Sequence, residues 1–100
     1  MLRCDYCARL LYKNVSGKYN LCSAKCKGKY KNKNHILVLE REVFSIISNG
    51  NTVKEIISNL DKDKFEVVSA VRRMVYKHKK LTLKKNTEIN LSTKIFIKKK

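Results

Sequence analysis

Four cysteines in the first 26 residues form the most chemically distinctive pattern of this 100-residue sequence. They occur as two pairs, Cys4-x2-Cys7 and Cys22-x3-Cys26, with fourteen residues between the pairs. A gap of two residues lets both thiolates of a tight turn point at one ion, and a gap of three places the second pair on one side of a helix start. The pattern predicts one structural Zn²⁺ ion in a tetrahedral four-sulfur site.

Two disulfide bonds are the other interpretation of these cysteines, and the spacing alone does not exclude them. The sequence begins without the apolar stretch of a secretory signal peptide, and thiols inside most cells stay reduced. Both points favour zinc and a cytoplasmic protein. Because a catalytic zinc ion needs an open coordination position, which four cysteines do not leave, we expect the metal to be structural.

The residues around the cysteines predict a small metal-stabilised module. Short strands are expected at 10–12 and 19–21, with a turn at 14–18 between them. Ser23 is expected to cap a helix that starts at Ala24 and carries Cys26 in its first turn. Tyr30, one turn later, is expected to pack near the metal. A module this small needs the metal for much of its folding free energy.

This order of knuckle, hairpin and ligand-bearing helix resembles treble-clef zinc fingers. The segment Leu21-Cys22-Ser23-x-x-Cys26 resembles the Phe-Cys-Ser and MYM-type fingers in particular. Ala8 departs from the pattern, since such knuckles often have glycine at this position. The resemblance implies a module that contacts protein or nucleic acid.

The charge distribution indicates an anionic partner. The formal net charge is +16, and it divides into +8 for residues 1–34, +1 for residues 35–78 and +7 for residues 79–100. Such an excess attracts polyanions, and a nearly balanced middle between two basic ends predicts a folded scaffold with two positive patches. The longest strictly aliphatic run, residues 36–39, is far too short to span a membrane, so we expect no membrane partner.

From residue 35 the apolar period becomes helical. A first helix is expected to end near Asn49, with Gly50 as its left-handed C′ residue. Thr52 and Glu55 predict a capping box at the start of a second helix. Asp63 is expected to cap a third helix. The apolar faces of the three helices are Leu39, Val43, Ile46 and Ile47; Val53, Ile56, Ile57 and Leu60; and Val67, Val68, Val71, Met74 and Val75.

The opposite face of the third helix carries groups suited to base edges and phosphates. These are Ser69, Arg72, Arg73, Tyr76 and Lys77. Glu66, near the start of the helix, is the exception, with three possible roles: it caps, accepts a hydrogen bond from cytosine, or repels phosphate.

After Lys80 the apolar period becomes two, which predicts strands at 81–83 and 88–91 with a turn at 86–87. Residues 94–98 are expected to add a strand or a tail segment. Three lysines surround this hairpin, namely Lys84, Lys85 and Lys94.

Three helices followed by a basic hairpin resemble the winged helix-turn-helix of prokaryotic transcription regulators, most clearly from Thr52 to Tyr76. In that family the later helix enters the major groove and the wing contacts the backbone or the minor groove. The resemblance implies that Ser69, Arg72, Arg73 and Tyr76 lie near the bases, and that Lys84, Lys85 and Lys94 are wing contacts.

The sequence therefore predicts an α+β protein with a zinc finger at 1–34 and a winged helix at 35–100. The expected function is double-stranded DNA binding in transcription regulation, with further phosphate contacts from Lys25, Lys27 and Lys29. Two alternatives stay open: an interaction adaptor within a transcription or replication complex, for example on RNA polymerase, and an RNA- or ribosome-associated zinc protein. The sequence has no nucleophile–base pair and no phosphate-binding glycine loop, so we expect no enzyme. The oligomeric state is left open.

Overall fold

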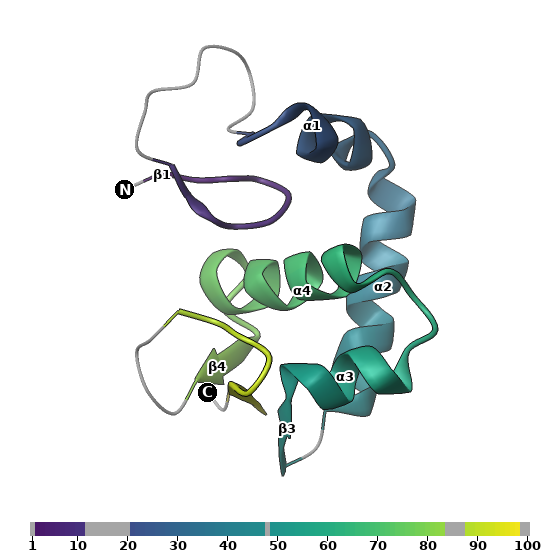
Figure 1. The fold of residues 1–100 in the computed structure, drawn as a ribbon, viewed down its shortest axis with the longest axis vertical. Helices are drawn as coiled ribbons and strands as arrows, with labels where there is room; N and C mark the ends of the chain where they lie inside the picture. The colour runs from purple at the N-terminus through teal and green to yellow at the C-terminus, as the bar shows by residue number, and fades with distance from the viewer. Residues whose placement is uncertain (1, 12–20, 48, 84–87, 99–100) are drawn as a thin grey trace.

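A computed structural model describes residues 2–11, 21–47, 49–83 and 88–98, and shows an α+β fold (Figure 1). The elements in chain order are β1 (Leu2–Arg3), β2 (Leu10–Leu11), α1 (Ala24–Tyr30), α2 (Lys33–Ile46), β3 (Asn49–Thr52), α3 (Val53–Asn59), α4 (Lys64–Arg72), the π-helical turn η1 (Arg73–Lys77), β4 (Leu81–Leu83) and β5 (Lys94–Ile97). Within the described residues, no helix has the length and apolar character needed to cross a membrane.

The N-terminal strands differ from the prediction. The strand at Leu10–Leu11 is confirmed, but it pairs with Leu2–Arg3 in an antiparallel hairpin that encloses the first cysteine pair. The predicted turn at 14–18 and most of the predicted strand at 19–21 lie outside the described residues, and Leu21 is not in a strand.

Each helix begins at a side chain that caps it. Ser23 accepts a hydrogen bond from the Cys26 amide. Asn32 caps α2, which begins at Lys33, two residues before the helical period predicted from residue 35. The capping box of Thr52 and Glu55 is complete. The Asp63 carboxylate accepts from the Glu66 amide at the start of α4, so the predicted caps are confirmed.

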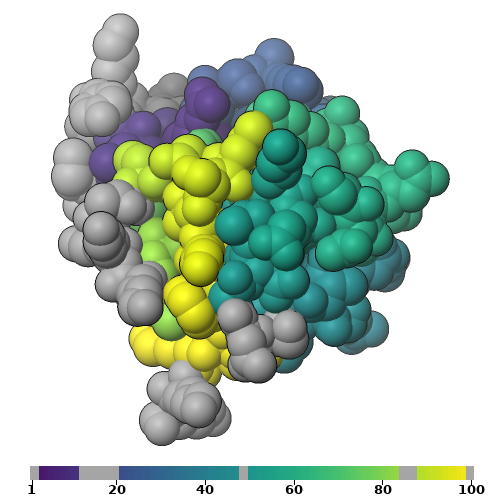
Figure 2. Space-filling view, turned by 60° about the horizontal axis from the view of Figure 1, so that its bottom comes forward, coloured from purple at the N-terminus to yellow at the C-terminus, as the bar shows by residue number. Residues whose placement is uncertain are grey.

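The second sheet has the order β3-β5-β4, with all pairs antiparallel. The segment 94–98, for which the sequence left a strand or a tail open, forms the central strand β5 at Lys94–Ile97. The predicted strand at 88–91 is wrong, because the Asn90 carboxamide accepts from the Ser92 amide and closes a turn there. Residues 88–93 instead run beside the start of α3, where the Val53 amide donates to the Thr93 carbonyl and the Lys54 amide to the Leu91 carbonyl. Figure 2 shows the yellow C-terminal segment lying against the teal one.

The sequence predicted Gly50 as the C′ residue of α2, and this prediction is wrong. The helix ends at Ile46, and Gly50 lies in β3 with a φ of +86°, beside a register shift between Asn49 and Asn51. A Cβ atom at this position would lie 2.6 Å from Cε1 of the Phe96 ring. The glycine therefore serves a β-bulge rather than a helix end.

The main core lies where α2, α3 and the β3-β5-β4 sheet meet α4 (Figure 1). The apolar residues predicted for the three helices are buried or half-buried in it, and Leu81, Ile89 and Ile95 complete it from the C-terminal segment. Figure 1 shows α4 between α3 on one side and the N-terminal segments on the other. The helix is consequently covered on two faces, which the sequence did not predict.

Gly50→Ala should lower the free energy of unfolding by about 1–3 kcal/mol, because alanine is strained at positive φ and its Cβ would displace the Phe96 ring. Gly28→Ala is the matched control, since nothing lies within 4 Å of a Cβ at that position in α1. It should leave stability unchanged or raise it by up to about 1 kcal/mol. Urea unfolding of the metal-loaded protein measures both, and equal effects would contradict the bulge assignment.

Candidate metal centre and nucleic-acid interface

The four cysteines come together as one cluster, with all four Sγ atoms within 4.8 Å of one another. Cys22 Sγ lies 3.5 Å from both Cys7 Sγ and Cys26 Sγ, and all four cysteines are free. Sulfurs bound to one tetrahedral zinc ion at about 2.3 Å would lie about 3.8 Å apart, whereas a disulfide needs about 2.05 Å. The cluster therefore fits a single metal ion.

The first cysteine pair is held by a knuckle that requires a left-handed residue. Ala8 has a φ of +60° and is fully buried. Its amide donates to the Cys4 carbonyl, and the Cys4 amide donates to the Arg9 carbonyl, both at 2.9 Å. The Arg3 guanidinium closes the turn from outside by donating to the Ala8 carbonyl at 2.7 Å. Alanine thus adopts the conformation that glycine favours in such knuckles.

The thiols of the cluster differ in how easily they lose their protons. The hydrogen bond with the Cys7 thiol lowers the pKa of Cys4 to about 4. The same bond, together with burial, raises the pKa of Cys7, and burial raises the pKa of Cys26 to about 11. A metal ion must therefore displace protons from the buried thiols, which makes its affinity fall as the pH falls.

Tyr6, between the cysteines of the first pair, docks the cluster onto α4. Its ring is buried and stacks on Phe65, with 5.8 Å between the ring centroids. Phe65 and Ile36 belong to the same apolar cluster as the cysteines, and Tyr30 packs against it as predicted. The cysteine cluster therefore shares an apolar core with residues on α2 and α4.

Arg73 ties three segments together at the end of α4. Its Nη1 donates to the Tyr6 carbonyl at 2.7 Å, and its Nε donates to Glu40 Oε2 on α2 at 2.8 Å. His78 Nε2 lies 3.5 Å from the other Glu40 oxygen. Arg73 is 2% exposed and Glu40 is 6% exposed. A pair this deeply buried is a structural contact that solvent and ligands do not reach.

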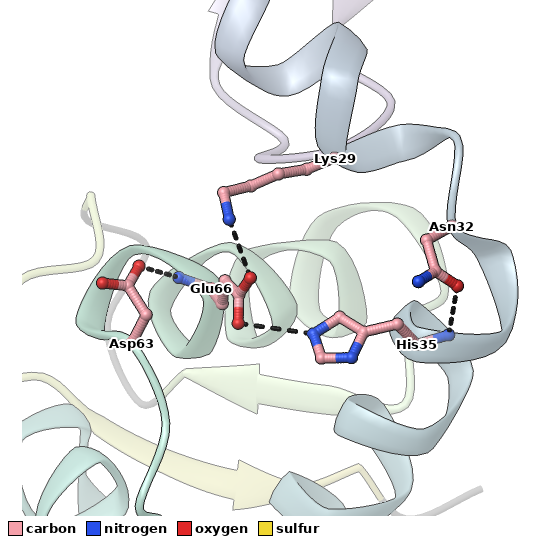
Figure 3. Close-up of polar contacts among 5 residues, drawn as sticks. All are labelled: Lys29, Asn32, His35, Asp63 and Glu66. Atoms are coloured by element: carbon pink, nitrogen blue, oxygen red, sulfur yellow. Dashed lines mark hydrogen bonds and ion pairs between the residues drawn. The ribbon is translucent and has the colours of Figure 1, made fainter.

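We call the cysteine-bearing residues 2–11 and 21–30 the N-terminal module. Glu66 forms a second connection between this module and α4 (Figure 3). Its carboxylate accepts from Lys29 Nζ at 2.7 Å and lies 3.3 Å from His35 Nε2. The hydrogen bond from Lys29 holds the pKa of Glu66 below its usual value. Glu66 therefore neither closes a capping box at Asp63 nor presents an uncompensated negative charge.

The face of α4 and η1 that the sequence predicted to contact bases lies against the N-terminal module. Ser69 and Arg73 are each 2% exposed, so the expectation that they contact DNA bases is wrong in this fold. The Arg3 guanidinium lies 3.8 Å from the centroid of the Tyr76 ring, and Lys77 Nζ pairs with Asp5. The sequence predicted that this polar stripe is exposed to solvent. The residues that cover it, Arg3, Asp5 and Tyr6, are distant in sequence and gave no local signal.

The predicted phosphate contacts are dispersed. Lys27 and Lys94 are exposed, whereas Lys29 is engaged with Glu66. Lys84 and Lys85 lie outside the described residues. Lys25 is exposed, and its Nζ lies 4.1 Å from the centroid of the Phe65 ring on α4. Lys25 therefore lies against a side chain of α4.

The accessible side of α4 carries positive charges from two modules. Arg9, Lys64 and Arg72 line a pocket of about 360 Å³ together with Phe65 and Val68, and none of the described residues that line it is acidic. We call Arg9, Lys25, Lys64 and Arg72 the α4 cation cluster. The sequence interpretation missed Arg9 and Lys64. The signal for Lys64 was the stripe Lys64-Val68-Arg72 at i, i+4 and i+8, whereas no local pattern pointed to Arg9.

Arg72 is the one arginine of the predicted set that this cluster retains. Its side chain is half-buried, and its Nε is enclosed with no hydrogen-bond partner among the described residues. An enclosed donor without a partner is costly. Nη2 of Arg73 is enclosed in the same way, so it is the pocket lining, rather than the enclosed Nε, that connects Arg72 with a ligand.

Arg73→Met should destabilise the protein by about 3–5 kcal/mol, because Glu40 would stay buried without its guanidinium. The double variant Arg73→Met/Glu40→Leu removes both charges and should recover most of that loss. Lys77→Met removes a half-exposed partner of Asp5 and should cost less than about 1 kcal/mol. Denaturant unfolding measures the free energy of unfolding of each variant. A double variant as unstable as Arg73→Met would show that the unpaired Glu40 charge is not the cause of the loss.

One equivalent of Zn²⁺ or Co²⁺ should bind, and the cobalt form should show the absorption of a tetrahedral thiolate site. Cys26→Ser should weaken binding at least about a hundredfold, because it removes a buried ligand. Chelation should also remove amide protection around Phe65 in α4, since Tyr6 packs there. Titration and amide exchange measure these effects. A stoichiometry of zero would contradict the metal site. Unchanged amide protection in α4 after chelation would contradict the shared core.

Comparison with known proteins gives no match to a family model, to a curated protein or to a solved structure. The function of the chain therefore has to be argued from its own residues and geometry.

Proposed function

We propose that the protein is a zinc-stabilised, double-stranded DNA-binding protein that acts in transcription regulation. The single observation that carries the proposal is the α4 cation cluster: Arg9 lines one pocket with Lys64 and Arg72, and Lys25 lies against Phe65, which lines the same pocket. Cations gathered on one face of a helix attract the phosphate backbone of a duplex.

The order of the elements supports this proposal. Helices α2, α3 and α4 are followed by strands β4 and β5, and β3 pairs with the other edge of β5. This arrangement is compatible with a winged helix, in which α3 and α4 are the helix pair and β4 and β5 are the strands of the wing. In such a protein α4 is the helix that enters the major groove.

The orientation of α4 in this proposal differs from that expected from the sequence. The face with Ser69 and Arg73 is occupied by Tyr6 and its neighbours, so the stripe Lys64-Val68-Arg72 is the one available to DNA. This stripe combines two cations with an aliphatic side chain. Arginine reads guanine through two hydrogen bonds, and aliphatic groups contact the thymine methyl.

The metal has a supporting role in this mechanism. Bound Zn²⁺ would draw together Cys4, Cys7, Cys22 and Cys26 and so fix the two loops that carry Arg9 and Lys25. The ion would be structural, because four thiolates leave it no open position. Glu66, in the first turn of α4, is compensated by Lys29 and so does not add an unpaired negative charge to the helix.

Binding to duplex DNA should weaken steeply with salt, with a log–log slope of about −3 to −4 if the four cations each meet a phosphate. The double variant Lys64→Gln/Arg72→Gln should lower the affinity and make the slope shallower by about 2. Lys79→Gln removes one positive charge outside the cluster and should change the slope by much less than about 1.

Fluorescence anisotropy at several salt concentrations measures these slopes, with structured RNA as competitor. A slope near zero would remove the duplex-binding proposal. Equal competition by RNA would favour the RNA-associated alternative. If Lys79→Gln weakens binding as much as the double variant, the DNA contacts lie elsewhere on the basic surface.

A further inference from the structure

A second groove, with no residue in common with the α4 cation cluster, lies between α2, the end of η1 and β5. It has a volume of about 780 Å³, within the range of ligand-binding pockets. Leu37, Phe44, Met74 and Ile97 contribute its apolar surface. Three of these side chains are well exposed: Leu37 by 55%, Phe44 by 38% and Ile97 by 37%. Exposed apolar groups gathered in one groove mark an interaction site more often than isolated ones do.

The rim of the groove is positive. Arg41 lies between Leu37 and Phe44 on α2, and Lys79, Lys80 and Lys98 line the other side. The acidic residue in the lining is Glu40, which is buried and paired with Arg73 and His78. The charge of the rim is therefore uncompensated by the acid within the groove.

The lysines of the rim stand on a fixed turn. The Lys80 amide donates to the Met74 carbonyl at 2.8 Å, and the Lys98 amide donates to the Lys80 carbonyl at 3.1 Å. Lys79 has a φ of +55°, a conformation that favours glycine. The turn therefore keeps a charged side chain at a position where glycine would relax the backbone.

We propose that this groove binds an acidic amphipathic helix of a partner protein. Leu37, Arg41 and Phe44 occupy positions i, i+4 and i+7 of α2, so they form a two-turn face along which a second helix can lie. The apolar side of that helix fills the groove, and carboxylates beside it meet Arg41, Lys79, Lys80 and Lys98. This combination of apolar anchors and charge complementarity is the helix-in-groove mode of recognition.

A second copy of the chain is a poor occupant, because it would bring another formal charge of +16 to a basic rim. Nucleic acid satisfies the cations but leaves the exposed leucine, phenylalanine and isoleucine side chains without apolar partners. The acidic helix is the occupant that satisfies both parts of the groove.

The probe is a fluorescein-labelled 16-residue peptide with leucines at i, i+3 and i+7 on one helix face and glutamates on both sides of them. One control peptide has lysine in place of each glutamate, and another has serine in place of each leucine. Each is titrated with the full, zinc-loaded chain, and fluorescence anisotropy gives the affinity. The acidic peptide should bind saturably, and both control peptides should bind at least about tenfold more weakly.

Leu37→Ser should weaken binding of the acidic peptide about tenfold. Val38→Ser is the matched control, because Val38 is 50% exposed on the same helix but does not line the groove; it should change the affinity less than about twofold. Lys79→Gly should weaken binding about threefold while the melting temperature stays unchanged or rises, since glycine relaxes the backbone.

Three results would overturn the proposal. One is an equal effect of the two serine variants, and another is equal binding of the lysine control peptide. The third is loss of duplex DNA binding, rather than peptide binding, in Lys79→Gly, which would make this face a nucleic-acid surface. Since the groove and the α4 cation cluster share no residue, peptide binding can fail while DNA binding persists, and the reverse.

Discussion

The buried guanidinium of Arg73 is the interaction on which the arrangement of the protein depends. It donates to Glu40 on α2 and to the Tyr6 carbonyl beside the cysteine cluster, and it lies 4.8 Å from the centroid of the Tyr6 ring. A buried charge is tolerated only when each of its partners stays in place. Arg73 therefore couples the N-terminal module to two helices of the main core.

This coupling decides which side of α4 meets solvent. Tyr6, Asp5 and Arg3 cover the side with Arg73, Tyr76 and Lys77, so the stripe with Lys64 and Arg72 is left accessible. Under the proposed function, the metal centre thus acts on recognition indirectly: it shapes the loops that cover one face of α4, and it delivers Arg9 and Lys25 to the other. The groove along α2 stays free for a different partner.

Local signals in the sequence predicted much of the fold. The cysteine spacing predicted the metal cluster, the caps at Ser23, Thr52 and Asp63 predicted three helix starts, and the apolar periods predicted the core. The failures have a common physical cause, since each depends on a partner distant in sequence. Gly50 is required where the Phe96 ring leaves no room for a Cβ atom, and the face of the helix that carries Arg73 is buried by Tyr6. Helical periodicity identifies a polar stripe, but it does not reveal whether water or another module covers it.

The two arginines at the end of α4 allow a direct test of this account. Arg72 Nε is enclosed without a partner among the described residues, whereas Arg73 Nε donates to Glu40. NMR spectra of the arginine Nε–H groups in the zinc-loaded protein, recorded during titration with duplex DNA, report on each separately. The account predicts that the Arg72 signal shifts while the Arg73 signal stays in place. A shift of the Arg73 signal with an unchanged Arg72 signal would contradict it, because DNA would then have displaced the N-terminal module from α4.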